Sequence, residues 1–182
     1  MKIKLKKIGF IILSILLLLL VLNLIQSPIT IENEVNVNAS NHEVFTVLAS
    51  YKKFTEWSPF LVADPQQKNW ITGEDGLVGS KFHWEGVDEE SEGFQELVKF
   101  KRPNLLVMQC VISVPFESNP AFRYDLISNS STTTVKQKFT MPSSMLNKIM
   151  MTAFGVLEEI SSTNKLGLER LKKYLETNSA AS

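Results

Sequence analysis

The sequence predicts an α+β fold, in which a curved antiparallel sheet is covered by a long C-terminal helix and preceded by one transmembrane helix. Short stretches in the middle of the chain alternate apolar and polar residues, as strands with one buried face do. The last third carries an apolar stripe at three- and four-residue steps, which indicates a helix that covers another layer. A long apolar run lies behind a lysine-rich N-terminus.

The N-terminal run extends from Ile8 to Ile25 and follows four lysines. As a helix it rises about 27 Å, close to the ~30 Å of a bilayer's hydrocarbon core. The alternative is a cleaved signal peptide, whose apolar core is usually about 7–15 residues long and ends in a small-x-small site. Here the run is longer, and Ile25 and Pro28 flank the only small residue, Ser27. We therefore expect an uncleaved anchor.

This anchor defines the expected organisation. Residues 1–27 are the basic flank and the transmembrane helix, 28–177 are one globular domain, and 178–182 are a disordered tail. Because basic flanks stay in the cytoplasm, the protein is expected to be a single-pass membrane protein with a cytoplasmic N-terminus. The domain then faces the periplasm or the cell exterior.

Charge and cysteine content exclude several functions. The chain has nineteen basic and nineteen acidic residues, and four lysines precede the apolar run, so the remainder carries a net charge of −4. An acidic domain argues against nucleic acid, which needs a basic surface. Cys110 is the only cysteine, so no internal disulfide can form, and its apolar neighbours suggest a buried thiol. No cofactor motif is present, and the sequence does not identify a protein partner.

The elements follow in order. Apolar residues alternate over 29–37, which predicts a first strand with one buried face. The spacing of Ser40 and Glu43 is that of a capping box, so a helix should begin at Asn41. A second short helix is expected over 51–57, and Pro59 ends it because proline disfavours helical geometry in the residue before it.

The middle of the chain predicts a meander of short strands with turns between them. Their short connections imply antiparallel pairing. The expected strands are 80–85, 93–100, 105–112, 121–127 and 132–140.

The C-terminal third predicts one long helix that begins near Pro142, since proline suits a first helical turn. Its apolar stripe is about 30 residues long and should cover the sheet. The stripe consists of Leu146, Ile149, Met150, Ala153, Leu157, Ile160, Leu168, Leu171 and Leu175.

Three segments resemble the START-like (SRPBCC) superfamily, in particular its polyketide cyclase/dehydrase-like branch. Residues 44–59 resemble the family's helix pair that ends in Trp-x-Pro, residues 76–86 its Gly-x-x-Gly turn before a strand, and residues 167–175 the end of its long helix. The resemblance covers about residues 29–176. It implies a helix-grip fold with a deep apolar cavity between the sheet and the long helix. Relatives bind lipids, hydrophobic hormones or polyketides, and a few are cyclases or hydratases.

Strand parity predicts which side chains face that cavity, because alternate residues of a strand point to opposite faces. Phe82 and Trp84 share one face, as do Phe122 and Tyr124. The helix stripe contributes further residues, and Trp57 and Phe60 either close the mouth of the cavity or fill the core. The expected ligand-binding residues are Trp57, Phe60, Trp84, Phe94, Tyr124, Gln137, Phe139, Met150 and Phe154.

Glu96 shares its strand face with Phe94, Val98 and Phe100. If this face is inward, Glu96 is a carboxylate in an apolar pocket, and desolvation would raise its pKa as in a general acid. The alternative, which we favour, is a rim position where Glu96 meets solvent or Lys99.

Metal binding is not expected. His83 and Glu85 share a strand face, but two ligands do not make a zinc site. The only other histidine, His42, falls in a first helical turn, and Cys110 lies in an apolar strand.

The sequence thus predicts a membrane-tethered domain that binds a small apolar molecule, such as a lipid or a quinone-like or polyketide-like ring. Two alternatives remain open. One is a cyclase or dehydratase that uses Glu96 and Tyr124 as acid–base groups, and the other is a protein-interaction module of the same fold.

Overall fold

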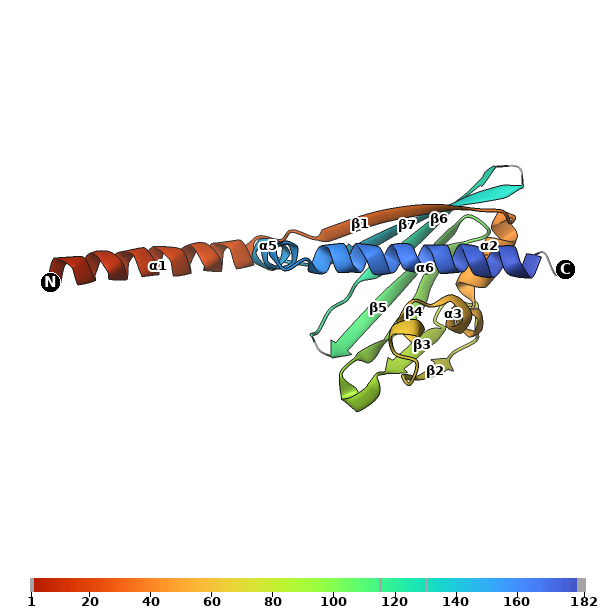
Figure 1. The fold of residues 1–182 in the computed structure, drawn as a ribbon, viewed down its shortest axis with the longest axis horizontal. Helices are drawn as coiled ribbons and strands as arrows, with labels where there is room; N and C mark the ends of the chain where they lie inside the picture. The colour runs from red at the N-terminus through yellow and green to blue at the C-terminus, as the bar shows by residue number, and fades with distance from the viewer. Residues whose placement is uncertain (1, 115, 130, 180–182) are drawn as a thin grey trace.

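The computed structural model describes residues 2–114, 116–129 and 131–179 and shows the predicted α+β fold. Seven antiparallel strands form one sheet in the order β1-β7-β6-β5-β4-β3-β2. The sheet curves beneath a long C-terminal helix (Figure 1). The strands are β1 (Ile29–Val37), β2 (Lys68–Thr72), β3 (Lys81–Glu85), β4 (Glu92–Lys101), β5 (Leu105–Val114), β6 (Ala121–Asn129) and β7 (Thr132–Met141).

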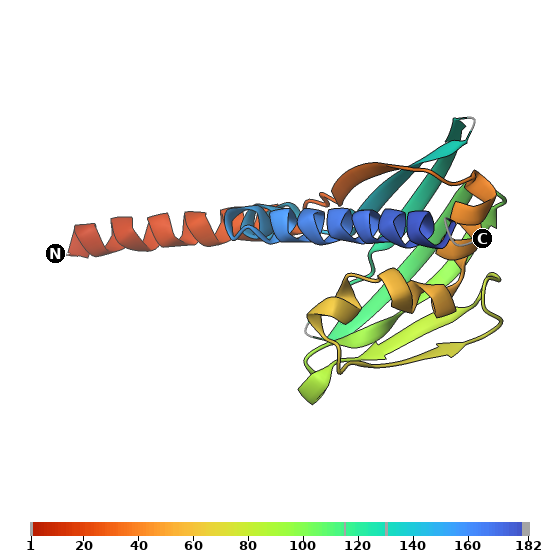
Figure 2. The same cartoon turned by 45° about the vertical axis from the view of Figure 1, so that its right-hand side comes forward.

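The helices lie before, within and after this sheet. Two of the three short helices between β1 and β2 cover one end of its concave face, and the long last helix extends along it (Figure 2). The helices are α1 (Lys2–Leu24), α2 (Asn41–Ala49), α3 (Tyr51–Trp57), α4 (Phe60–Ala63), the 3-10 turn η1 (Val87–Glu89), α5 (Met145–Ala153) and α6 (Val156–Ser179).

Most elements begin where the sequence predicts. Helix α2 begins at Asn41 with the expected capping box, in which the Ser40 amide donates to Glu43 Oε2 at 2.8 Å and the Glu43 amide donates to Ser40 Oγ at 3.3 Å. The five expected middle strands are present as β3 to β7. Three short elements were not expected, namely the edge strand β2, the single helical turn α4 and the 3-10 turn η1.

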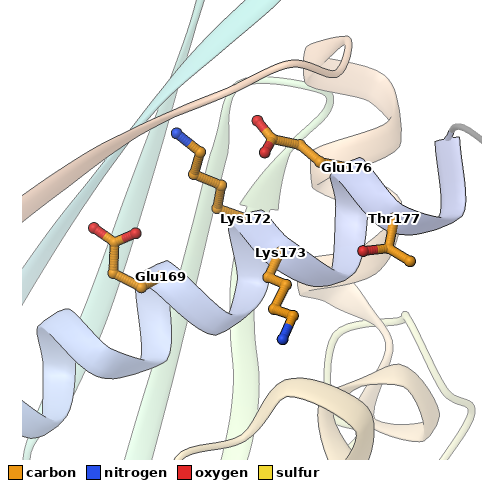
Figure 3. A pocket seen from close by; sticks show the side chains of 5 residues that line it. All are labelled: Glu169, Lys172, Lys173, Glu176 and Thr177. Atoms are coloured by element: carbon orange, nitrogen blue, oxygen red, sulfur yellow. The ribbon is translucent and has the colours of Figure 1, made fainter.

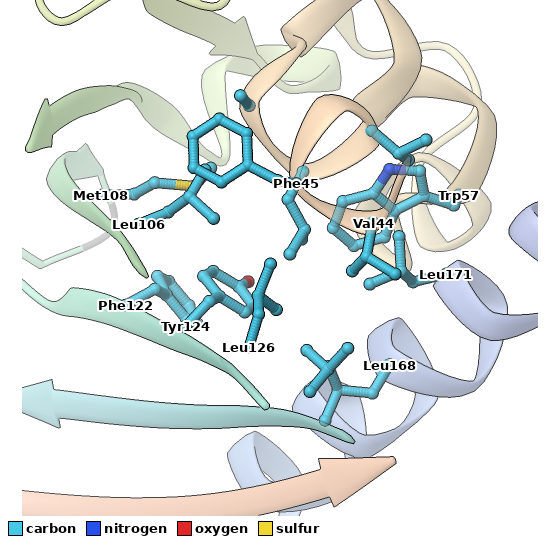
Figure 4. Close-up of a cluster of buried hydrophobic side chains, with 14 of the residues drawn as sticks. Val44, Phe45, Trp57, Leu106, Met108, Phe122, Tyr124, Leu126, Leu168 and Leu171 are labelled. Atoms are coloured by element: carbon cyan, nitrogen blue, oxygen red, sulfur yellow. The ribbon is translucent and has the colours of Figure 1, made fainter. Parts of the chain in front are cut away.

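The core lies between the concave face and the helices. Leu168, Leu171 and Leu175 form the buried stripe of α6. They face the sheet together with side chains of α2 and α3, and Figure 4 shows this cluster around Val44, Phe45 and Trp57. Burying each large apolar side chain contributes about 1.5–3 kcal/mol, so α6 is an integral part of the fold.

The prediction of one continuous C-terminal helix is wrong, because the chain breaks between α5 and α6. Gly155 has a φ of 74°, a left-handed conformation that ends a helix. The first helical residue is Met145, and Ser144 rather than Pro142 caps it by accepting from the Asn147 amide at 3.2 Å. Only α6 covers the sheet, and no residue of α5 is buried.

Helix α1 projects away from the domain (Figure 1). Within the described residues, one helical segment, Lys6–Leu24, is long and apolar enough to cross a membrane, and it is not buried in the protein. Its C-terminal end is joined to the start of α5 by backbone hydrogen bonds: Ser27 N donates to Ser143 O and Met145 N to Ile25 O, both at 2.7 Å. Helix α6 extends through Ser179, and residues 180–182 of the expected tail lie outside the described residues.

Candidate functional site

Three polar side chains form a row across the concave face of the sheet. Asn33 of β1 is paired in register with Gln137 of β7, and Gln137 with Tyr124 of β6. Residues directly opposite each other point to the same face, and all three face the core. Gln137 Nε2 donates a hydrogen bond to Tyr124 Oη at 3.1 Å. We call Asn33, Gln137 and Tyr124 the interior polar row.

Helix α6 contributes Asn164 to the same place. The Asn38 amide donates to Glu176 Oε1 at 3.0 Å, and β1 and α6 run in the same direction from the end near α5 (Figure 1). From this contact the strand extends back to Asn33 over about 17 Å, and the helix extends back to Asn164 over about 18 Å. Asn164 therefore lies at the level of Asn33.

Several buried polar atoms here have no hydrogen-bond partner among the described residues. They are Asn33 Nδ2, Tyr51 Oη, Trp57 Nε1, Ser58 Oγ, Gln137 Oε1 and Asn164 Nδ2. Buried polar groups are nearly always paired, and each unpaired one costs about 1–3 kcal/mol. The interior therefore carries hydrogen-bonding capacity that the surrounding side chains do not use.

The groups of this interior are neutral. Burial raises the pKa of Tyr51, and the nearby Cys110 and Tyr124 add to this effect. Burial raises the pKa of Tyr124 to about 12, although its hydrogen bond with Gln137 lowers it. Burial likewise raises the pKa of Cys110 to about 12, against the effect of Gln95. Among the described residues the buried polar side chains are all uncharged, so the site offers hydrogen bonds without a charge.

Apolar side chains surround these groups. In Figure 4, Tyr124 and Leu126 from the sheet point toward Leu168 and Leu171 of α6. Phe122 and Phe139 extend the wall, with their ring centroids 5.2 Å apart. Neutral polar groups and apolar side chains therefore lie together in this interior.

Four of the expected ligand-binding residues lie on this interior. Trp57, Tyr124, Gln137 and Phe139 are buried, and the last three lie together on β6 and β7. Trp84 also points inward, where it is half-buried. A Cβ atom at Gly93 would collide with its ring, and its Nε1 donates to Ser91 Oγ at 3.1 Å.

The other four lie elsewhere. Phe60 is on α4 and exposed, and Met150 and Phe154 belong to α5 and the turn after it, which do not cover the sheet. The inward orientation expected for Phe154 is wrong, because this side chain is 73% exposed. Phe94 lies on the convex face, where its ring is 5.6 Å from His83. No observation on these four residues supports a role in ligand binding.

Glu96 also lies on the convex face, because the buried residues of β4 are Gly93, Gln95 and Leu97. It forms an ion pair with Lys81 at 3.3 Å, rather than with Lys99. Tyr124 points to the opposite face of the sheet. The two residues therefore cannot act on one substrate as an acid–base pair.

His83 lies on the convex face in an aromatic stack. Its ring is parallel to that of Trp70, with centroids 5.1 Å apart, and its Nε2 is 2.9 Å from Thr72 Oγ1. Glu85 is paired with Lys68 at 2.6 Å. Within the described residues, no group of three His, Cys, Asp or Glu side chains could hold a metal ion.

Asn33, Asn164 and Tyr51 were not predicted as site residues, although the sequence carried a signal for Asn33 and for Asn164. Asn33 has the same parity as Val35 and Val37 in the first strand, so it had to face inward with them. Asn164 follows Ile160 and precedes Leu168 by four residues, so it continues their stripe. In both cases a polar residue interrupts an otherwise apolar pattern.

Two depressions on the surface are separate from this interior. One, of about 500 Å³, lies on the outer side of α6 among Glu169, Lys172, Lys173, Glu176 and Thr177 (Figure 3). The other, of about 320 Å³, lies beside the β2–β3 hairpin and η1. Both are open and carry charges of both signs, as a solvated surface does, so they do not suit an apolar ligand.

No protein-family model matches the chain, and no curated protein matches its sequence. Solved structures do share its fold. Norcoclaurine synthase from Thalictrum flavum has 15% identity and a TM-score of 0.57, over 81% of this chain and 88% of its own. A protein of unknown function from Staphylococcus aureus has 11% identity and a TM-score of 0.65, over 85% and 98%. Ara h 8.0201 has 13% identity and a TM-score of 0.54, over 83% and 99%.

These similarities support the predicted helix-grip fold. They do not test the resemblance to the polyketide cyclase/dehydrase-like branch. At such low identity they establish the fold alone.

Proposed function

We propose that the domain binds a small, uncharged, largely apolar molecule between the sheet and α6, with the interior polar row as its hydrogen-bonding partner. The observation that carries this proposal is the set of buried, unpartnered atoms on Asn33, Gln137, Asn164 and Tyr51. A ligand with one or more hydroxyl or carbonyl groups would satisfy them and remove the cost of leaving them unpaired.

The absence of buried charge narrows the ligand class. Among the described residues the interior holds only neutral polar groups, so a phospholipid headgroup has no counter-ion there. A quinone-like or polyketide-like ring, or a neutral lipid, fits better. Norcoclaurine synthase of the same fold, with a TM-score of 0.55 and 15% identity, has been solved in complex with dopamine and hydroxybenzaldehyde. This complex supports the idea that the fold can hold small aromatic molecules.

We further propose that α1 tethers the domain to a membrane. Its apolar segment is not buried in the protein, and an exposed apolar helix of this length is stable in a bilayer rather than in water. By the distribution of lysines, the N-terminus is cytoplasmic and the domain lies in the periplasm or outside the cell. The domain would then bind its ligand close to the membrane surface.

Native mass spectrometry of the detergent-purified full chain tests the ligand proposal. We expect the wild type to carry one small molecule per chain. A double variant, Tyr124→Phe with Gln137→Leu, keeps the apolar shape but removes the hydrogen-bonding groups, and it should lose the molecule.

The matched control is Arg123→Gln with Lys138→Gln. These residues lie on the convex face of the same two strands, and this variant should carry as much ligand as the wild type. A wild type without any bound molecule would contradict the proposal, and so would a double variant that retains the full amount.

A further inference from the structure

Helix α5 exposes large apolar side chains on one of its faces. Leu146, Ile149, Met150 and Ala153 recur at three- and four-residue steps and share one face. No side chain of α5 is buried, and Ile149, Met150 and the following Phe154 are among the exposed large apolar residues. Ile149, Met150 and Phe154 are therefore directed away from the protein, while Met151 on the other side of α5 packs against the core.

Two polar side chains of α5 also form hydrogen bonds with neighbouring segments. Asn147 Nδ2 donates to Ser143 Oγ at 3.1 Å. Lys148 Nζ donates to the carbonyl of Pro28 at 3.4 Å. A helix with this arrangement is unfavourable in water, and it becomes favourable where a second apolar phase meets its outer face.

The position of α5 points to a lipid bilayer as this second apolar phase. The start of α5 is joined to the end of α1 by the backbone bonds described above, and Ser144 Oγ donates to Asn23 Oδ1 at 3.2 Å. The apolar run of the anchor ends at Ile25, so α5 begins where the chain leaves the hydrocarbon. In Figure 1, α5 is seen nearly end-on while α1 lies in the plane of the picture, so α5 runs across the axis of the anchor.

We propose that α5 is an interfacial helix that lies in the membrane surface, with Ile149, Met150 and Phe154 buried in the bilayer. This inference rests on the membrane anchor proposed above. Interfacial helices bury their apolar face about 5–10 Å into the boundary between headgroups and acyl chains. Together, α1 and α5 would hold the domain at a fixed orientation, with the N-terminal end of α6 toward the membrane.

Site-directed spin labelling of the full chain in phosphatidylcholine nanodiscs tests this proposal. Nitroxides are attached to Ile149→Cys or Phe154→Cys in a Cys110→Ala background, and their collisions with oxygen and with a water-soluble nickel chelate are compared. Leu166→Cys is the matched control, because Leu166 and Ile149 are both 48% exposed, but Leu166 is on α6, away from the anchor. Leu17→Cys marks the middle of the anchor.

We expect the oxygen-to-nickel collision ratio at residues 149 and 154 to be severalfold higher than at residue 166, and lower than at residue 17. Equal ratios at residues 149, 154 and 166, with residue 17 in lipid, would overturn the interfacial helix and leave the anchor intact. A water-like ratio at residue 17 would overturn both.

Spin–spin broadening between two labelled chains in one disc would assign the face to a second copy and would also overturn the proposal. The small-molecule content of the same preparations, measured by native mass spectrometry, reports on the interior site independently. All labelled positions are exposed in the protein, and the Cys110→Ala change in the core is common to every labelled variant.

Discussion

Asn164 and Leu168 lie one turn apart on the same buried stripe of α6, but their substitution by alanine should have different consequences. Asn164 Nδ2 is buried without a partner, and alanine is the better helix former. Asn164→Ala should therefore leave the free energy of unfolding unchanged or raise it by about 1 kcal/mol. Leu168→Ala should lower it by about 2–5 kcal/mol, because it empties a packed site.

Denaturant unfolding of the protein freed of bound small molecules, followed by tryptophan fluorescence, measures both variants, since all three tryptophans lie in the domain. An Asn164→Ala variant that loses as much stability as Leu168→Ala would show that the amide is fully bonded in the folded state. The Asn164 amide would then have a structural role, and it would no longer support a bound ligand.

His83 gives a prediction on pH. Burial lowers the pKa of His83, and repulsion from Lys81 adds to this effect. The folded state disfavours protonation of His83, so the contribution of His83 to the free energy of unfolding is fully present above its pKa in the unfolded chain, about 6.5. This contribution is lost as the pH falls through the lower pKa that His83 has in the folded protein.

Lys81→Met should raise the pKa of His83 toward its ordinary value, as an NMR titration of the imidazole measures. Lys138→Met is the control, because it breaks another convex-face ion pair, that with Glu32, on strands remote from His83. A wild-type pKa at or above about 6.5 would contradict the described surroundings of His83.

At the scale of single residues, parity predicted the faces of β6 and β7 correctly, so Tyr124, Gln137 and Phe139 were found. For β4 the sequence did not determine which face points toward the core. A register shift occurs between Leu97 and Lys99, so that Leu97 and Phe100 both reach the core although their parity differs. Such a bulge depends on the pairing with β5, which the sequence of β4 alone does not contain.

At the scale of elements, the break after α5 separates a helix that covers the sheet, α6, from one that does not, α5. Gly155 has a left-handed backbone, and no other atom lies within 4 Å of the position of a Cβ. Gly155→Ala should therefore lower the free energy of unfolding by about 1–2 kcal/mol through backbone strain. Gly155→Asn should lower it less, because asparagine tolerates this conformation.

Thermal unfolding of the two variants in the same detergent provides the measurement. If alanine at this position stabilises the protein, the helix continues through residue 155, and α5 and α6 are one element. The interfacial role of α5 would then have no structural basis.

The helical pattern alone could not reveal this break. Apolar residues recur at helical steps on both sides of Gly155, so the periodicity predicts one helix. Yet the two halves face different environments, because α6 packs on the sheet and α5 packs beside the end of α1. A hydrophobic pattern shows that a face is buried, but it does not distinguish burial in a core from burial in a membrane.

At the scale of the whole molecule, the order of elements was enough to predict the fold. A capped helix pair after the first strand, a meander and a long amphipathic helix leave few other arrangements. The interior site was less predictable, because its residues come from β1, β6, β7, α3 and α6. Only the assembled sheet and helix bring Asn33 and Asn164 to the same level.

The function of the molecule as a whole depends on whether a ligand occupies this interior. The side-chain amides of Asn33 and Asn164 have no partner in the ligand-free protein, and we expect them to donate hydrogen bonds to the ligand when it is bound. These two NH₂ groups therefore report directly on occupancy.

The most direct measurement is the NMR spectrum of the side-chain amides of the full chain as purified, compared with the chain after removal of bound small molecules by unfolding and refolding. We predict that the Asn33 and Asn164 signals differ between the two samples. They should return when the extracted molecules are added back, while the exposed Asn178 signal stays constant. Identical Asn33 and Asn164 signals in all samples would contradict ligand binding at the interior polar row.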